Sequence, residues 1–240
     1  MRSTVRSEGG SRGGSRGGAL PWVAPLYVGA LQLGACATAR LPVRRRTELL
    51  RAHSTNVANL RAGRWGTLAT SAAFVEEPLP AAYGAALLAA LGTAEARWGA
   101  GRAAAVFAAG HVGASLLVYA GLRARNRARG AAAERAAAGS TGPGAQARPA
   151  GGGTAHAVDV GASYGFYATL GALAVSLPHR GARAAATGGL LALGAAPVVR
   201  RGRTFTDVGH LTALSLGVAI GVARGAGAAG TPIRAPRTAT

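Results

Sequence analysis

The chain has 240 residues, and its 27 basic residues, all of them arginine, outnumber its 8 acidic residues and give a formal net charge of +19. Only 15% of the residues are charged and 49% are hydrophobic, whereas about 25% are charged in a typical soluble domain. A charge of this size would suit a nucleic-acid-binding protein, but the arginines fall in clusters between long stretches without formal charge. The composition therefore favours a membrane protein over a soluble domain, and we expect no nucleic-acid partner.

Six stretches without formal charge predict six membrane-spanning helices. A membrane helix needs roughly 20 mostly apolar residues, and each span must be helical because lipid offers no partner to backbone N–H and C=O groups. The many Ala and Gly residues suit close helix packing in lipid. We therefore predict an all-α membrane protein, a six-helix bundle within residues 19–223, with helices at about 19–39, 78–94, 103–122, 160–178, 184–199 and 208–223.

Three segments around these helices are expected to lack regular structure. Residues 1–18 carry Ser-Arg-Gly-Gly repeats, residues 123–158 combine arginines with a Gly-rich run, and residues 224–240 are similarly rich in small residues. Low-complexity composition of this kind is typical of tails and flexible linkers. We expect a disordered basic N-terminal tail, a flexible linker between the third and fourth helices, and a disordered C-terminal tail.

The first apolar stretch has a second interpretation as a cleaved signal. It follows a basic tail and ends in Leu33-Gly-Ala-Cys36, which resembles the lipobox of a bacterial lipoprotein. Uncharged residues continue past Cys36 to Ala39, and five more apolar stretches follow, so we expect a retained membrane helix. Because Cys36 is the only cysteine, no disulfide can form within the chain.

Polar side chains inside membrane helices are costly and mark candidate functional sites. Ser163 opens the fourth predicted helix between Gly161 and Gly165. These small neighbours leave the hydroxyl accessible, and the unpaired N–H groups of a helix N-terminus can hold a developing oxyanion. The same Gly-x-x-x-Gly spacing is also a helix-packing motif, so this segment has both a catalytic and a packing interpretation. The third predicted helix carries two more polar candidates, His111 and Ser115.

His210 stands about one turn into the sixth predicted helix. Ala213, Gly217 and Gly221 follow at intervals of four residues and form a small-residue face, which lets another helix approach the imidazole. In a six-helix bundle the fourth and sixth helices begin at the same membrane face, so we expect Ser163 and His210 at similar depth. A serine beside a histidine is the minimum for nucleophilic catalysis; the alternative is a structural histidine at a helix interface.

Two aspartates each precede one of these helices. Asp159 stands before the fourth and Asp207 before the sixth. A carboxylate at a helix N-terminus can accept hydrogen bonds from the unpaired N–H groups there. We therefore predict that both aspartates cap the helices that follow them.

The segments that carry Ser163 and His210 resemble motifs of the rhomboid family of intramembrane serine proteases. Gly161-Ala-Ser163-Tyr-Gly165 resembles the Gly-x-Ser-Gly nucleophile motif at the start of the fourth helix. Gly209-His210, followed by Ala213 and Gly217, resembles the sixth-helix motif, in which Gly usually occupies the position of Ala213.

Two further segments strengthen this resemblance. Residues 64–74 resemble the first-loop segment with its Trp-Arg pair, here reversed as Arg64-Trp65, and residues 95–102 resemble the Glu-x-x-x-Gly stretch between the second and third helices. The run 53–59 and the pair Gly110-His111 are closer to a divergent actinobacterial rhomboid-like group.

The resemblance implies a six-helix rhomboid-like bundle in the bacterial plasma membrane. In it Ser163 would attack a peptide carbonyl and His210 would activate the serine, with Gly161, Tyr164 and His111 as weaker candidates for supporting the oxyanion. The substrate would be a transmembrane segment of another protein, unwound near the first loop. The lipid bilayer is the other expected partner, and neither a metal nor an organic cofactor is implied.

Departures from the family pattern leave a second function open. Rhomboid proteases commonly carry a His and an Asn on the second helix that help to bind the oxyanion, but the matching positions here are near Pro80 and Gly84. Tyr164 also stands where Gly usually follows the serine. Loss of an oxyanion donor can cost about 10² to 10³ in turnover. A slow protease, an inactive relative that binds membrane helices, and a transporter or structural membrane protein are therefore all retained as hypotheses.

The arginines give conflicting information about membrane orientation. Segments on the side of the two termini carry 11 arginines and the opposite loops carry 16, so the positive-inside rule would place those loops in the cytoplasm. The resemblance instead implies cytoplasmic termini, and we adopt that topology.

Overall fold

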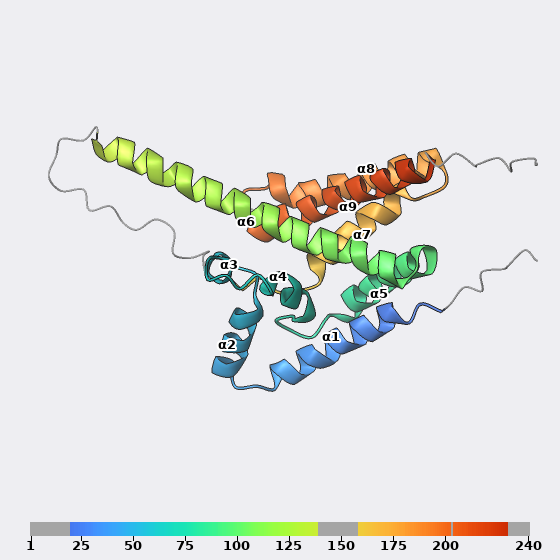
Figure 1. Cartoon of the computed structure of the whole chain (residues 1–240), viewed down its shortest axis with the longest axis horizontal. Coiled ribbons are helices and arrows are strands. Elements are labelled where there is room, and N and C mark those ends of the chain that lie inside the picture. Colours follow the sequence, from blue (N-terminus) through green and yellow to red (C-terminus); the bar gives the residue numbers. More distant parts are fainter. Residues whose placement is uncertain (1–19, 139–157, 203, 230–240) are drawn as a thin grey trace, which may run out of the picture.

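The computed structural model describes residues 20–138, 158–202 and 204–229, and every regular element among them is helical (Figure 1). This confirms the prediction of an all-α protein. The elements are α1 (Val23–Ala39), α2 (Val43–His53), α3 (Val57–Arg61), α4 (Thr67–Thr70), the 3₁₀ turn η1 (Ser71–Ala73), α5 (Ala81–Trp98), α6 (Ala100–Ala138), α7 (Ser163–Val175), α8 (Arg180–Val199) and α9 (Phe205–Ala229).

The short helix α7 lies inside the bundle and contacts α5, α6, α8 and α9 (Figure 1). Most of its 13 residues are buried. Phe166 belongs to an apolar cluster with residues of α1 and α5, whereas Tyr164 packs with Ala114 of α6 and Ala213 of α9. Two core clusters therefore meet on α7, which fixes the start of this helix and Ser163 with it.

The outer surface of the bundle is apolar. Leu33 of α1 and Leu193 of α8 are each 73% exposed, and Leu117 of α6 is 54% exposed. No residue of α8 is buried, although this helix carries several Leu and Val side chains. Large apolar side chains that face outward on several helices are typical of a protein whose surroundings are lipid.

Three described helical segments are long and apolar enough to cross a membrane: Ala100–Arg135, Arg180–Val199 and Phe205–Gly225. The apolar helix α1 has 17 residues and is shorter than these. The 13 residues of α7 rise only about 20 Å, less than the ~30 Å thickness of the hydrocarbon core. Membrane helices are therefore present, and the count of six spans stays a prediction.

The prediction of a flexible linker from residue 123 is wrong for residues 123–138, because α6 continues to Ala138. These residues are mostly Ala and Arg, which are among the strongest helix formers. The charge of the arginines is unfavourable in lipid, but it does not prevent these residues from being helical. Likewise α5 passes through Glu95 and ends only at Gly99, which has a φ of +81°.

The C-terminal limit of the last helix also differs from the prediction. The helix α9 continues past residue 223 to Ala229, so the tail predicted from residue 224 is helical over its first residues. The N-terminal tail 1–18, most of the linker (139–157) and the C-terminal segment 230–240 lie outside the described residues.

The helix α1 is joined to α5, and to the segment just before α5, by polar contacts as well as by apolar packing. The two carboxylate oxygens of Glu95, in α5, accept hydrogen bonds from the N–H groups of Val23 (3.0 Å) and Ala24 (2.8 Å) at the start of α1. Further along, the side-chain oxygen of Gln32 accepts a hydrogen bond from the Leu79 N–H (2.8 Å). The Glu95 carboxylate thus acts as a cap for a helix that is distant in sequence.

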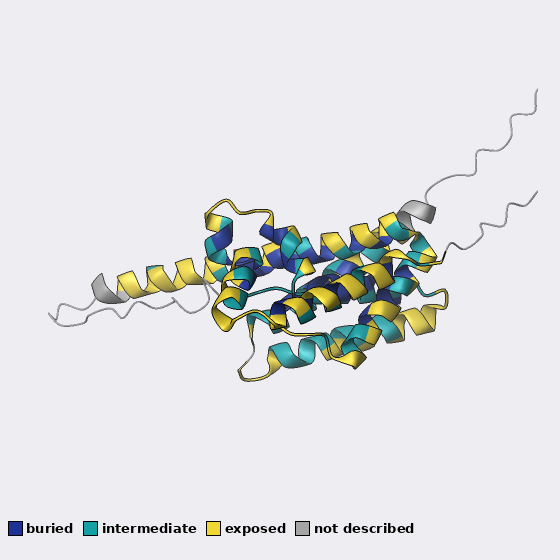
Figure 2. Ribbon diagram, turned by 90° about the horizontal axis from the view of Figure 1, so that it is seen from below, coloured by how far each residue is buried: buried dark blue, intermediate teal, exposed yellow. Residues whose placement is uncertain are grey.

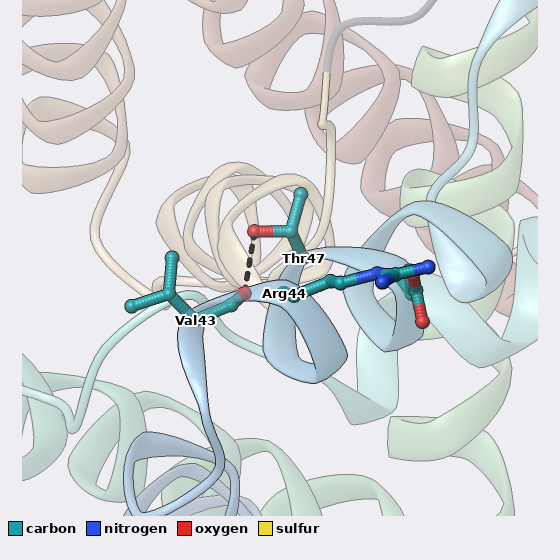
Figure 3. Close-up of polar contacts among 4 residues, drawn as sticks. Val43, Arg44 and Thr47 are labelled. Atoms are coloured by element: carbon teal, nitrogen blue, oxygen red, sulfur yellow. Dashed lines mark hydrogen bonds and ion pairs between the residues drawn. The ribbon is translucent and has the colours of Figure 1, made fainter.

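The segment between α1 and α5 folds into α2, α3, α4 and η1, which we call the first loop. Its first helix, α2, buries Leu50 but exposes most of its first turn, and it carries an ion pair between Arg44 and Glu48 (3.0 Å). Beside this pair the Thr47 hydroxyl donates a hydrogen bond to the Val43 carbonyl (2.9 Å; Figure 3). An exposed pair of this kind contributes little to stability. The contacts that hold the first loop lie instead at its buried end.

Candidate functional site

The helices α7 and α9 pack in parallel through small residues. A Cβ atom added to Gly217 would lie 1.9 Å from the carbonyl oxygen of Ala168, and one added to Gly221 would lie 3.1 Å from the Cα of Ala172. Gly217 thus faces Ala168, and Gly221, four residues later, faces Ala172, also four residues later. The two helices therefore run in the same direction. The two helices begin at the same end of the bundle, which brings the segments with Ser163 and His210 to a similar level.

The imidazole of His210 lies among the tyrosines of α7. Its ring stacks on Tyr167 (centroids 4.5 Å apart, planes at 27°) and meets Tyr164 edge-on (5.7 Å, 75°). Tyr167 follows Ser163 by four residues, so the two side chains share one face of α7. The Nε2 atom of His210 is buried and has no hydrogen-bond partner among the described residues.

Ser163 is the first residue of α7 and is partly buried. No hydrogen bond within the described part of the chain joins its hydroxyl to His210. Hydrogen-bond reach is about 2.6–3.2 Å between heavy atoms, and catalytic contacts are often looser before substrate binds. The fold thus brings the two helices together without closing a serine–histidine hydrogen bond.

The first loop holds the segment that leads into Ser163. Ser71 accepts a hydrogen bond at its carbonyl from the Gly161 N–H (2.8 Å), the Thr55 N–H donates to the Asp159 carbonyl (3.1 Å), and the Asp159 N–H donates to the Ser54 hydroxyl (2.7 Å). Gly161 has a φ of +135° and nothing within 4 Å of an added Cβ, so this glycine is needed for its backbone conformation. Close packing against a neighbour is provided instead by Gly165, which abuts the ring of Phe107.

A buried polar cluster lies where the first loop meets α6. The Ser71 hydroxyl is 2.9 Å from Nε2 of His111 and accepts a hydrogen bond from the Thr55 hydroxyl (2.9 Å). The Tyr119 hydroxyl of α6 contacts the Thr55 carbonyl and donates to a carboxylate oxygen of Asp159 (2.9 Å). Sequence reasoning found His111 as a polar residue within a helix but missed Ser71, whose only signal is its place in the 64–74 segment.

This second serine–histidine pair has a structural role. Ser71 is 0% exposed and His111 is 4% exposed, so no external peptide can reach the hydroxyl. The pair joins η1 to the middle of α6. It therefore fixes the first loop, and with it the start of α7.

Asp159 does not cap α7 as predicted. The helix has Ala162 at its N-cap with no side-chain hydrogen bond, and the carboxylate of Asp159 faces Tyr119 instead. Burial raises the pKa of Asp159 to about 6, an effect that the hydrogen bond from Tyr119 opposes and the nearby negative charge of Glu76 reinforces. Asp207 lies in the first turn of α9 and not before it as predicted, and it forms a reciprocal capping pair with Thr204, the residue before the helix. The Asp207 carboxylate accepts from the Thr204 N–H (2.7 Å), and the Asp207 N–H donates to the Thr204 hydroxyl (3.2 Å).

Tyr164 lies between the two histidines. Its ring centroid is 6.1 Å from that of His111 and 5.7 Å from that of His210, and its hydroxyl would lie 2.4 Å from a Cβ atom on Gly209. The Tyr164 hydroxyl, Nδ1 of His111 and Nε2 of His210 are all buried without a hydrogen-bond partner among the described residues. Three such atoms on adjacent rings can form hydrogen bonds with a polar group of a bound molecule. Across the described residues, no three His, Cys, Asp or Glu side chains converge as metal ligands would.

These features define an all-helical membrane protein with a serine at the start of one buried helix and a histidine on the helix packed beside it. The family model for the rhomboid-like protein matches residues 15–229. The chain therefore belongs to the rhomboid-like family. Comparison with curated proteins gives no match, and comparison with solved structures gives none.

Proposed function

We propose that this rhomboid-like protein is an intramembrane serine endopeptidase in which Ser163 is the nucleophile and His210 the general base. The observation that carries the proposal is the environment of His210. Its imidazole stacks on Tyr167, one turn after Ser163, and its Nε2 atom is unpaired among the described residues. A base needs a free nitrogen, and a fixed ring orientation reduces the entropy lost on reaching the transition state.

The proposed reaction has the usual two halves of serine catalysis. Ser163 Oγ bonds to the carbonyl carbon of the substrate as His210 accepts the hydroxyl proton, and the imidazolium then returns that proton to the departing amine. Water attacks the acyl-enzyme in the second half and releases the carboxylic acid and the free serine. The N–H groups of the first turn of α7 have no acceptor within the helix and are suited to hold the oxyanion.

The proposed substrate is a transmembrane segment of another protein. An intact helix hides its peptide bonds in its own hydrogen bonds, so the substrate must unwind before Ser163 can attack it. The contacts of Ser71 and Thr55 with residues 159–161 put the first loop beside that serine, which favours unwinding there. We propose the bacterial plasma membrane, as in an actinobacterium, as the location and a six-span topology for the chain.

A catalytically inactive protein that binds membrane helices is the second candidate. It is favoured by the lack of a Ser163–His210 hydrogen bond in the described structure. It is also favoured by the buried ring of Tyr164, 2% exposed, immediately after the serine. On this alternative the unpaired polar atoms around Tyr164 bind a polar group of a client helix without cleaving it.

A fluorophosphonate probe separates the two candidates. The full chain, purified in detergent, is treated with the probe, and the labelled peptide is located by mass spectrometry. A peptidase predicts labelling at Ser163 that is lost in Ser163→Ala and strongly reduced in His210→Ala. The matched control is Ser176→Ala, which removes an exposed serine at the other end of α7 and should label like the wild type.

Each outcome of this experiment has a clear meaning. Labelling that persists in Ser163→Ala would refute the assignment of Ser163 as the nucleophile. Absence of labelling in a folded wild-type protein, together with equal capture of a membrane-helix peptide by both alanine variants, would favour the inactive alternative.

A further inference from the structure

The second half of α6 is a basic rod beyond the apolar part of the bundle. Residues 123–138 of this helix carry five arginines and one glutamate. They project away from the other helices in Figure 1, and the side chains described beyond residue 122 are almost all exposed in Figure 2. With a rise of about 1.5 Å per residue, this segment extends roughly 24 Å.

A groove of about 530 Å³ lies between this part of α6 and the start of α9. Its apolar end is lined by Leu117, Val118 and Val208, and its basic end by Arg125 and Arg129. No acidic side chain lines it. The nearby carboxylate of Asp207 is engaged by Thr204 in the cap of α9.

The order of these residues follows the depth of a membrane. Leu117 lies in the apolar half of α6, whereas Arg125 lies eight residues further, about 12 Å along the axis. Arg125 and Arg129 are four residues apart and share one face of the helix. The groove thus runs from apolar side chains to two guanidinium groups, which is the order that a lipid chain and its headgroup would require.

We propose that this groove binds one anionic phospholipid, with its phosphate between Arg125 and Arg129 and an acyl chain along Leu117 and Val208. Guanidinium groups match phosphate oxygens in bidentate geometry, and basic pockets between membrane helices suit acidic headgroups. The apolar end selects a lipid over a free phosphate or a nucleic acid, which have no chain to fill it. Neither Ser163 nor His210 of the proposed peptidase lines the groove, although Val208 and Thr212 lie two residues to either side of His210 on α9.

The test measures retention of phosphatidylglycerol by native mass spectrometry of the full, delipidated chain in detergent, with phosphatidylcholine as the neutral reference. The double variant Arg125→Gln/Arg129→Gln is expected to bind phosphatidylglycerol about tenfold to thirtyfold more weakly. The matched control, Arg123→Gln/Arg127→Gln, removes the same charge from the same helix but outside the groove, and it should bind nearly as well as the wild type.

A second variant fills the groove while both arginines remain. Gly121 lines the groove, and nothing lies within 4 Å of a Cβ atom added there. Gly121→Trp should therefore fold, because it replaces a poor helix former at an open position, and it should lose phosphatidylglycerol. Its binding of glycerol phosphate or a short RNA should not change.

Three results would overturn the proposal. The control double variant could lose as much phosphatidylglycerol as the groove variant, which would indicate attraction to overall charge. Gly121→Trp could bind the lipid as well as the wild type does, or phosphatidylcholine could bind as tightly as phosphatidylglycerol. The Gly121→Trp result stands even if the groove double variant fails to fold.

Discussion

Replacement of Gly217 by alanine is expected to force α7 and α9 apart. The new Cβ atom would lie 1.9 Å from the carbonyl oxygen and 2.7 Å from the Cα of Ala168. Ordinary van der Waals contacts of a Cβ atom lie at 3.4–4 Å, so the helices would have to separate locally by about 1.5 Å in an interior packed to crystal density. Because the atoms in conflict belong to the backbone of α7, no change of rotamer relieves the overlap.

The size of the effect follows from two opposing contributions. Extra atoms forced into a well-packed interface cost about 1–3 kcal/mol, and a backbone clash belongs at the upper end of that range. Alanine in place of glycine inside a helix recovers about 0.8–1 kcal/mol. A net loss of about 1–2 kcal/mol is therefore expected. The same displacement would move His210, two turns earlier on α9, relative to Ser163.

The assay is thermal unfolding of the full chain in detergent, followed by tryptophan fluorescence. Gly225→Ala is the matched control, since Gly225 lies two turns further along α9 and has nothing within 4 Å of an added Cβ. Gly217→Ala should unfold at a lower temperature than the wild type, and Gly225→Ala at the same temperature or higher. A Gly217→Ala protein that unfolds no earlier than Gly225→Ala would refute the packing argument.

Two further predictions concern the buried polar cluster. Ser71→Ala removes the hydroxyl between Thr55 and His111, and leaving these groups unpaired is expected to cost about 1–3 kcal/mol, seen as earlier thermal unfolding. Asp159 should make stability depend on pH, because burial raises its pKa from the ordinary value of 3.8 to about 6 and the folded state therefore holds the proton more tightly than the unfolded state. Its contribution is complete below about pH 4 and is lost as the pH rises through about 6, so the unfolding temperature should fall over that range in the wild type and less so in Asp159→Asn.

Both predictions have direct controls. Ser176→Ala removes an exposed hydroxyl that donates to the Leu173 carbonyl (2.8 Å) and accepts a long, exposed hydrogen bond from Arg97 (3.4 Å), and it should change the unfolding temperature little. Equal effects of Ser71→Ala and Ser176→Ala would contradict the assigned role of Ser71. An Asp159→Asn protein with the same pH dependence as the wild type would show that another group titrates.

The sequence predicts the apolar helices α1 and α5 to α9, but it does not predict the short helices of the first loop and it places the helix ends poorly. Lipid excludes charge, so uncharged stretches reveal where helices can be buried in a membrane. A charge does not end a helix, however, and α5 stops only where Gly99 takes a positive φ. For the same reason the arginines after residue 122 led to the prediction of a linker there, although α6 continues through them.

The close packing of α7 against α9 was predicted correctly because it follows from local spacing, whereas the catalytic roles of Ser163 and His210 stay a prediction. The intervals from His210 to Gly217 and Gly221 indicate a close helix neighbour, and α7 is that neighbour. The contact of Ser71 with His111 joins residues 40 positions apart, and no local sequence pattern predicts it. Asp159 was misread because a carboxylate before a helix predicts a cap, whereas tertiary contacts with Ser54 and Tyr119 engage it.

The tie between the first loop and the start of α7 also has a consequence during synthesis of the chain. Ser54 and Asp159 are separated by 105 residues, which a ribosome adds in about 5 to 21 s at 5–20 residues per second. The helices α5 and α6 are made during that interval, while the groups of the first loop that will bond to residues 159–161 cannot yet pair with them. The segment that leads into Ser163 can take its final conformation only after this wait, when α1, α5 and α6 have already been made.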